Sequence, residues 1–188
     1  MQLRIAQVKD IENILKLHSK YHLTTISEED KQDGFITTIF SKEELVEIIE
    51  KEQGIFIATK NDSILGYVMS IPWQYLLKSE MFAFMIKDLP NLNYLGQNLS
   101  MDNSYQYGPV CIDKSARGSG LLEKLFYFAL ESMSKKYPIL VCFVNKLNER
   151  SYVAHKRKLG LDTIQEFEFN DHKYYEMVCD TTKRMLKN

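Results

Sequence analysis

A short glycine-bearing turn at residues 112–122 carries the clearest chemical signal in the sequence. Its centre is Arg117-Gly118-Ser119-Gly120. The apolar run before it is typical of a buried strand, and the apolar residues after it recur at helical spacing. A strand that turns through glycines into a helix gathers unpaired backbone N–H groups and the positive end of a helix dipole around one point. The sequence therefore predicts an anion site at this turn.

Composition limits the class of protein to which such a site can belong. The chain has 188 residues, 45% of them hydrophobic, which predicts one folded domain over residues 1–188. A net charge of −1 does not favour nucleic acid as a partner, and the four histidines do not cluster with cysteines as metal ligands do. Cys111, Cys142 and Cys179 each lie in an apolar run, as reduced core cysteines do, so we expect a cytoplasmic protein. With no leader and no run long enough to cross a bilayer, we expect neither secretion nor membrane insertion.

Strands and helices alternate around the turn. Residues 3–8 alternate at period two and predict a strand, after which Asp10 is placed to cap a helix. Ser41 and Glu44 have the spacing of a capping box and predict a helix that stops at Gln53-Gly54. Further strands are expected at residues 55–59, 64–71, 105–112, 139–144, 163–169 and 173–179, and further helices at 120–136 and 148–159. This order predicts an α/β fold with a mixed central sheet and a parallel crossover.

Two segments depart from the regular pattern. The connection at residues 73–104 is long for a compact domain, which favours a substrate-side insertion or lid, although an amphipathic helix packed on the sheet would also explain it. Gly108-Pro109 interrupts a strand that is otherwise typical of the centre of a sheet. Because proline cannot donate to a strand ladder, it predicts a bulge or a local parting from the neighbouring strand.

The element order and two motifs resemble the GNAT acetyltransferase family. The first motif is the turn at Arg117, and the second is Asn148-Glu149-Arg150-Ser151 followed by Leu159-Gly160. The resemblance covers essentially the whole chain, including Arg4, Ala6 and Asp10 near its start. It implies the GNAT acyl-CoA N-acyltransferase fold: a mixed sheet of about seven strands with a V-shaped parting between the fourth and fifth strands.

The resemblance also implies where acetyl-CoA would bind. In the family pattern Q/R-x-x-G-x-G/A, Arg117 takes the first position and Gly120 the fourth, while Leu122 stands where a small residue is usual. The amides of the turn would receive the pyrophosphate, and the strand before it would bind the pantetheine arm, with the Val110 amide facing the thioester carbonyl. Cys111 has no activating partner at a recognisable spacing, so a core role is favoured over a nucleophilic one. The residues implied for coenzyme binding are Val110, Cys111, Ile112, Arg117, Gly118, Ser119, Gly120, Leu121, Leu122, Asn148 and Ser151.

Two residues are candidates for the proton donor to the leaving thiolate. Asn148, Tyr152 and His155 recur at i, i+4 and i+7, so they share one helix face. The family often has a tyrosine where His155 stands, but one extra residue before Gly160 leaves Tyr152 as the alternative and a structural His155 as a third interpretation. The family's glutamate base falls at Gln106, which cannot take a proton, so no general base is assigned.

The function implied is an acetyl-CoA-dependent N-acetyltransferase. It would transfer acetyl to a primary amine, on a small molecule or a peptide, by direct attack in a ternary complex without a metal. A longer acyl donor remains open, as does a non-catalytic acyl-CoA-binding module, because Gln106 and His155 replace the usual proton-transfer residues. The oligomeric state, including a homodimer, is also left open.

Overall fold

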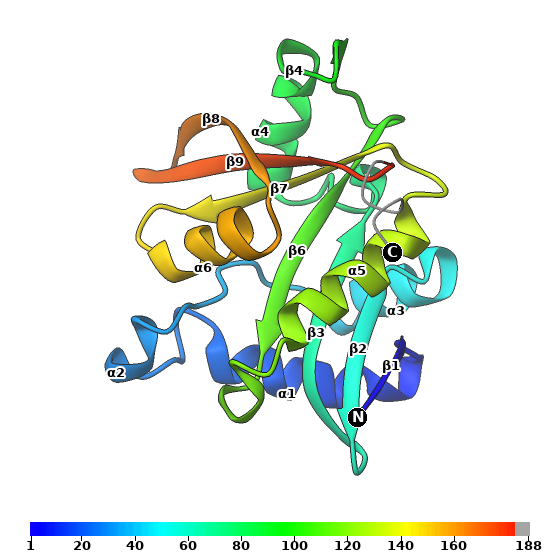
Figure 1. Cartoon of the computed structure of the whole chain (residues 1–188), viewed down its shortest axis with the longest axis vertical. Coiled ribbons are helices and arrows are strands. Elements are labelled where there is room, and N and C mark those ends of the chain that lie inside the picture. Colours follow the sequence, from blue (N-terminus) through cyan, green and yellow to red (C-terminus); the bar gives the residue numbers. More distant parts are fainter. Residues whose placement is uncertain (183–188) are drawn as a thin grey trace. The chain divides into compact units, whose positions relative to one another are not determined.

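A computed structural model of the chain describes residues 1–182 (Figure 1). The chain packs as two compact units that interleave along the sequence. Unit 1 comprises Met1–Ser70 and Gly108–Ala129, and unit 2 comprises Ile71–Tyr107 and Leu130–Asn188. The boundary falls inside strand β6 (Ser104–Ile112), between Tyr107 and Gly108. The grouping of residues 1–188 into a single domain stays a prediction.

Unit 1 contains strands flanked by helices, and its β1–β2 and β2–β3 pairs are antiparallel. Its strands are β1 (Gln2–Ile5), β2 (Ile55–Lys60), β3 (Ser63–Ile71) and the second part of β6, and its helices are α1 (Ile11–Tyr21), α2 (Glu28–Lys31), α3 (Lys42–Glu52) and most of α5 (Leu121–Met133). The hairpin of β2 and β3 was predicted and is confirmed, with Ile55 opposite Met69. β2 is apolar throughout its first four residues, all of them buried, as expected for a strand covered on both faces.

The two predicted helix caps of unit 1 have different outcomes. The capping box at α3 is confirmed: the Glu44 amide donates to Ser41 Oγ at 3.2 Å, and the Ser41 amide donates to Glu44 Oε2 at 2.8 Å. The cap by Asp10 is wrong, because its side chain does not accept from the amides of α1. Instead the Arg4 guanidinium donates to both Asp10 oxygens, at 2.6 and 2.8 Å, and its hydrogen bond holds the pKa of that carboxyl below its usual range.

Unit 2 is built on a parallel strand pair. The first part of β6 pairs with β7 (Ile139–Asn145), from Ser104 opposite Ile139 to Gln106 opposite Val141. β7 pairs antiparallel with β9 (His172–Asp180), which forms the predicted closing hairpin with β8 (Asp162–Phe169). The helices of this unit are α4 (Glu80–Asp88) and α6 (Glu149–Val153), and a small hairpin joins β4 (Asn93–Tyr94) to β5 (Gln97–Asn98).

The long connection at residues 73–104 is folded onto the sheet of unit 2. Trp73 is fully buried and its Nε1 donates to Ser104 Oγ at 3.0 Å. Phe82 of α4 is also buried and meets the ring of Phe143 edge-on, with centroids 5.8 Å apart. Packing of these side chains therefore explains why this segment is folded onto the sheet. Its predicted role as a substrate-side insertion or lid stays a prediction.

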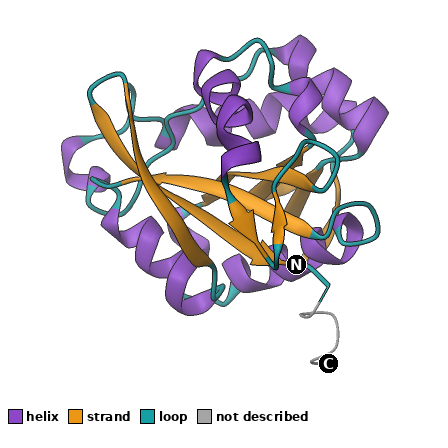
Figure 2. Cartoon of the chain, turned by 90° about the horizontal axis from the view of Figure 1, so that it is seen from above, coloured by secondary structure: helices purple, strands orange, loops and turns teal. Residues whose placement is uncertain are grey.

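The strand order is β1-β2-β3-β6-β7-β9-β8, a seven-stranded mixed sheet. Figure 2 distinguishes these strands from the helices by colour. The expected α/β fold with a mixed central sheet is confirmed. Within residues 1–182, no helix combines the length and apolar character needed to cross a membrane.

Candidate functional site

The predicted anion turn lies wholly within unit 1 and follows β6. Asp113 caps a short 3₁₀ turn, Lys114–Ala116, by accepting from the Ser115 amide at 3.0 Å. Gly118 and Gly120 then adopt φ angles of 78° and 75°, which L side chains rarely adopt. A Cβ atom added at either glycine would have no other heavy atom within 4 Å, so the backbone there borders open space.

The amides of this turn are available to a ligand. In the described part of the chain, the N–H groups of residues 118–122 donate to no backbone acceptor, and the first bond of α5 runs from the Lys124 amide to the Gly120 carbonyl. α5 has 13 residues, enough for its dipole to add positive potential at this end. These groups fit a diphosphate, which accepts several N–H bonds at once.

Arg117 is held by unit 1 rather than extended into solvent. Its Nε donates to the Ile112 carbonyl at 3.1 Å, and one terminal nitrogen donates to the Asp33 carbonyl at 3.1 Å. Its guanidinium carbon lies 4.8 Å from the centre of the Tyr21 ring, a cation–π contact. Some of the N–H groups of Arg117 therefore hold the turn in position.

Three further residues hold the turn, Lys20, Tyr21 and Asp30, and they were not identified from the sequence. Lys20 Nζ contacts Asp113 Oδ2 at 2.7 Å, the Lys114 amide donates to the Tyr21 hydroxyl at 2.7 Å, and Lys114 Nζ contacts Asp30 at 2.7 Å. Burial acts to raise the pKa of Asp113, but hydrogen bonds from Lys20 and Ser115 outweigh it and keep the carboxyl ionised. No local pattern could have found these contacts, because they join residues more than 80 positions apart.

The three residues implied for the pantetheine arm follow the cis Gly108–Pro109 peptide bond in β6. Val110 and Ile112 are partly exposed, whereas Cys111 is buried with its Sγ 4.0 Å from the Leu17 carbonyl oxygen. Burial raises the pKa of the Cys111 thiol to about 12. A thiol that stays protonated in the core is a poor nucleophile, which supports its interpretation as a packing residue.

The second predicted motif lies in unit 2 and contains an irregular helix. Asn148 caps α6, its side chain accepting from the Ser151 amide at 3.3 Å. After α6 the helix widens into a π-helical turn, Ala154–Lys158, in which the Leu159 amide donates to the Ala154 carbonyl at 3.2 Å. A π turn accommodates one residue more than an α turn. It therefore absorbs the extra residue that made the phase of this helix ambiguous in the sequence.

His155 is buried and faces β6. Its Nδ1 lies 2.7 Å from the Ser151 carbonyl oxygen, and its ring meets the Tyr107 ring edge-on, with centroids 5.9 Å apart. Because a carbonyl only accepts, Nδ1 carries the proton and Nε2 has a free lone pair in the neutral ring. Burial lowers the pKa of His155, so the imidazole is neutral at neutral pH and does not carry the second proton that an acid would give.

Tyr152 faces a different part of unit 2. Its ring stacks on Tyr175 of β9, with centroids 4.0 Å apart, and its hydroxyl lies 3.2 Å from Thr163 Oγ1 and 3.2 Å from Lys156 Nζ. These hydrogen bonds lower the pKa of Tyr152. The structure therefore separates the two candidate acids: His155 contacts β6, and Tyr152 contacts β8 and β9.

A buried carboxyl group, Glu176 of β9, was also missed from the sequence. It is 1% exposed, and burial raises its pKa to about 7. Gln106, at the family's base position, is likewise 1% exposed and donates from Nε2 to the Tyr107 carbonyl at 3.0 Å. Strand parity could not have identified Glu176, because residues of both parities are buried in this part of β9, including Met177, Val178 and Cys179.

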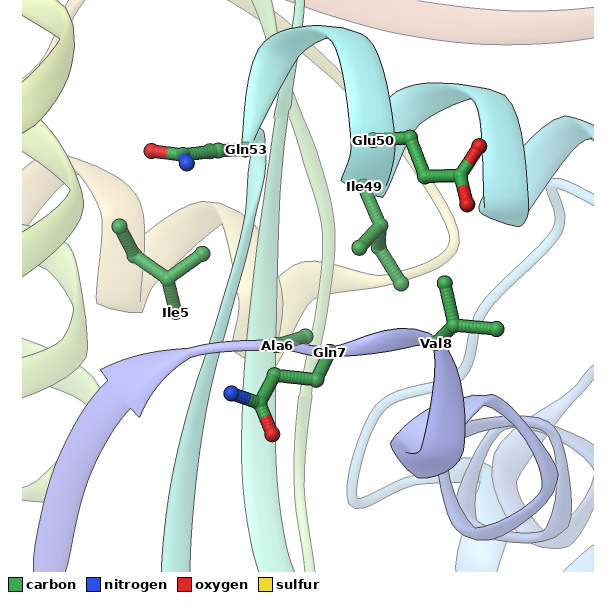
Figure 3. A pocket seen from close by; sticks show the side chains of 7 residues that line it. All are labelled: Ile5, Ala6, Gln7, Val8, Ile49, Glu50 and Gln53. Carbon is green, nitrogen blue, oxygen red and sulfur yellow. The ribbon is translucent and has the colours of Figure 1, made fainter.

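A shallow hollow of about 510 Å³ lies elsewhere in unit 1 (Figure 3). Side chains from the end of β1 and from α3 line it: Ile5, Ala6, Gln7, Val8, Ile49, Glu50 and Gln53. None of the residues implied for coenzyme binding or proton transfer lines it. Among residues 1–182 no group of histidine, cysteine and carboxylate side chains is arranged to hold a metal ion.

Comparison with known proteins identifies the fold. No protein-family model and no curated protein matches the chain by sequence. Among solved structures, a Salmonella typhimurium protein described as an acetyltransferase, determined with its cofactor acetyl-CoA, has a TM-score of 0.62 and 13% identity over 96% of this chain and 93% of its own. The ribosomal-protein-alanine N-acetyltransferase of Brucella melitensis has a TM-score of 0.60 and 16% identity, over 96% and 99%.

A spermidine N-acetyltransferase chimera from Vibrio cholerae and hSSAT is similar to the same extent. It has a TM-score of 0.59 and 16% identity, over 99% of this chain and 98% of its own. All three likenesses span nearly the full length of both chains, so they cover the whole arrangement rather than one motif. The chain has the GNAT fold, the mixed α/β fold of these N-acetyltransferases.

Proposed function

We propose that this protein is an acetyl-CoA-dependent N-acetyltransferase that acylates a primary amine. The observation that carries the proposal is the turn at residues 118–122, where free amides, two glycines with positive φ and the start of α5 border open space. A diphosphate is the group that such a turn binds best. The likeness to structures of N-acetyltransferases, one of them determined with acetyl-CoA, supports coenzyme A as the ligand that contains this diphosphate.

The coenzyme-binding residues have separate tasks in this proposal. The amides of Gly118, Ser119, Gly120, Leu121 and Leu122 bind the pyrophosphate, and Arg117 positions their turn through Ile112 and Asp33. Val110, Cys111 and Ile112 bind the pantetheine arm along β6, with the Val110 amide stabilising the oxyanion that forms at the thioester. Asn148 and Ser151 contact the arm at the start of α6.

Proton transfer to the leaving sulfur is assigned to the helix that contains Tyr152 and His155. His155 is neutral, so it serves this step only after it has taken a proton on Nε2. Tyr152 carries its own proton, and its lowered pKa favours donation. The H155F and Y152F variants distinguish the two candidates. Only substitution of the residue that acts as the acid should lower kcat without weakening coenzyme binding.

The acceptor is proposed by analogy with the named activities of similar proteins. Two of them act on ribosomal-protein alanine and on spermidine, so a peptide with N-terminal alanine and spermidine are the first two amines to test. The assay follows release of the coenzyme thiol from acetyl-CoA, and calorimetry measures coenzyme binding. Turnover of acetyl-CoA with an amine supports the proposal, and absence of coenzyme binding refutes it.

A second candidate function is a non-catalytic acyl-CoA-binding module. Gln106 at the base position and a neutral His155 favour it, because neither side chain performs its family counterpart's proton transfer in the state described. Tight binding of acetyl-CoA without thiol release on any amine would support this candidate over the enzyme.

A further inference from the structure

Glu176 is a carboxyl group that is buried in unit 2 without a positively charged partner among residues 1–182. Its Oε2 accepts from Gln165 Nε2 at 2.8 Å, while Oε1 is buried and has no hydrogen-bond partner among the described residues. No lysine or arginine of residues 1–182 forms an ion pair with it. Burying such a group costs stability. A buried polar atom left without a partner therefore calls for an explanation, and function is a frequent one.

The groups that face Glu176 favour its protonated form. Asp88 of α4 shares the Gln165 side-chain amide with Glu176, because Gln165 Nε2 also donates to Asp88 Oδ2 at 2.8 Å. From β7, Phe143 lies opposite Glu176 and the thiol of Cys142 lies nearby. Burial raises the pKa of Glu176 to about 7; the Gln165 hydrogen bond opposes this rise, and repulsion by Asp88 adds a smaller increase. A carboxyl group with this pKa exchanges protons at neutral pH.

Strand register places Glu176 on the same face of the sheet as Gln106. Glu176 lies opposite Phe143 and Gln106 lies opposite Val141, and Val141 and Phe143 are two residues apart on β7. Side chains two apart in a strand share a face. The Cα atoms of Glu176 and Gln106 are then roughly 12 Å apart, two strands over and two residues along. Gln106 Oε1 is also buried and without a partner among the described residues.

The other face of these strands has different chemistry. Tyr107 follows Gln106 in β6 and points to the opposite face, where it meets His155. Gln106 stands at the position where the family resemblance expects a glutamate base. The face on which a base is expected therefore lacks one on β6 but has a carboxyl group on β9.

We propose that Glu176 is the general base of the acetyl transfer and that it selects a cationic amine. The proposal rests on the proposed function. The ionised carboxylate takes a proton from the acceptor ammonium, and Gln106 Oε1 accepts a second N–H of the same nitrogen. The neutral nitrogen attacks the thioester carbonyl carbon, so the C–N bond forms as the C–S bond breaks. The acid, Tyr152 or His155, protonates the leaving sulfur, and the proton that the nitrogen loses as the amide forms replaces the proton of that acid. Glu176 returns its own proton to water.

The test is the pH dependence of kcat/KM, with spermidine and the alanine peptide as amine probes. In the wild type we expect an acidic limb near pH 7. E176Q keeps an oxygen that accepts from Gln165, and it should lower kcat/KM at pH 7 by roughly 100- to 10,000-fold and abolish that limb. The affinity for coenzyme A should be unchanged. Glu131→Gln, an exposed residue on α5, is the matched control and should leave the profile as it is.

Two further variants keep the proposal testable if E176Q does not fold. D88N removes the like charge but keeps an oxygen that accepts from Gln165, so it should move the limb to lower pH. Q165M removes the hydrogen bond to the carboxylate and should move it to higher pH. A limb that stays in place in both variants overturns the proposal, as does an active E176Q with the wild-type profile. A wild type that turns over neither amine overturns this inference alone, whereas a wild type that does not bind coenzyme A refutes the proposed function as well.

Discussion

The most direct test of the anion turn is a pair of glycine substitutions that cause the same strain. Gly118 in the turn and Gly96 in the loop between β4 and β5 have φ angles of 78° and 76°. An added Cβ would have no other heavy atom within 4 Å at either position. G118A and G96A therefore impose the same conformational penalty without a steric clash. They differ only in whether a ligand is expected beside the new methyl group.

The expected magnitudes follow from the geometry. An alanine in the left-handed region costs about 1–2 kcal/mol, which for a chain of this size lowers Tm by roughly 2–8 °C in both variants. In G118A the methyl group also occupies the space assigned to the pyrophosphate and displaces it from at least one amide. A charge-assisted hydrogen bond contributes about 1.5–3 kcal/mol, so the Kd for coenzyme A should rise roughly 10- to 150-fold. In G96A it should not change.

Calorimetric titration with coenzyme A measures Kd, and a thermal melt measures the shared strain. Equal losses of Tm with unequal losses of affinity would establish the turn as the phosphate site. Equal losses of Tm with coenzyme affinity retained in G118A would refute it, because a methyl group beside free amides cannot be neutral to a diphosphate bound there.

Three other outcomes are expected. A carboxyl group whose pKa is raised by folding stabilises the protein at low pH, and this stabilisation is lost as the pH rises from 4.5 toward 7. Between pH 4 and pH 8 the wild type should therefore lose about 3 kcal/mol more unfolding free energy than E176Q. Denaturant titrations at both pH values measure this difference, and an equal loss in the two proteins would contradict the assigned burial of Glu176. D30N should free Lys114 and tighten coenzyme A binding by roughly two- to fivefold at low salt, an effect absent from a K114M/D30N double variant. Cys111 should resist alkylation in the folded protein and react once it is unfolded, as mass spectrometry would detect; rapid labelling of native protein would exclude the core role assigned to it.

Local patterns predicted the elements of the fold well. The capping box at Ser41 and the hairpin of β2 and β3 were found because their signals lie within a few residues of each other. The cap assigned to Asp10 failed for the opposite reason. Arg4 lies on a different element, and a guanidinium that donates to both carboxylate oxygens competes successfully with single backbone amides.

The helix at residues 149–158 shows where a pattern reaches its limit. The sequence revealed one residue too many before Gly160 but could not say which turn absorbed it. The structure places the extra residue in a π turn and so directs His155 toward Tyr107 and Tyr152 toward Tyr175. The choice depends on packing against strands that lie elsewhere in the sequence.

The sequence by itself determined the order of strands and helices, the glycine turn and the resemblance that explains both, since these depend on periodicity, capping and turn chemistry along a short stretch of chain. Only the tertiary structure decided the charge states that matter for chemistry. Arg117 is positioned by Asp33, His155 is neutral, and Glu176 is buried beside Asp88. Desolvation and hydrogen bonding set these states, and both depend on which distant residues the fold brings together.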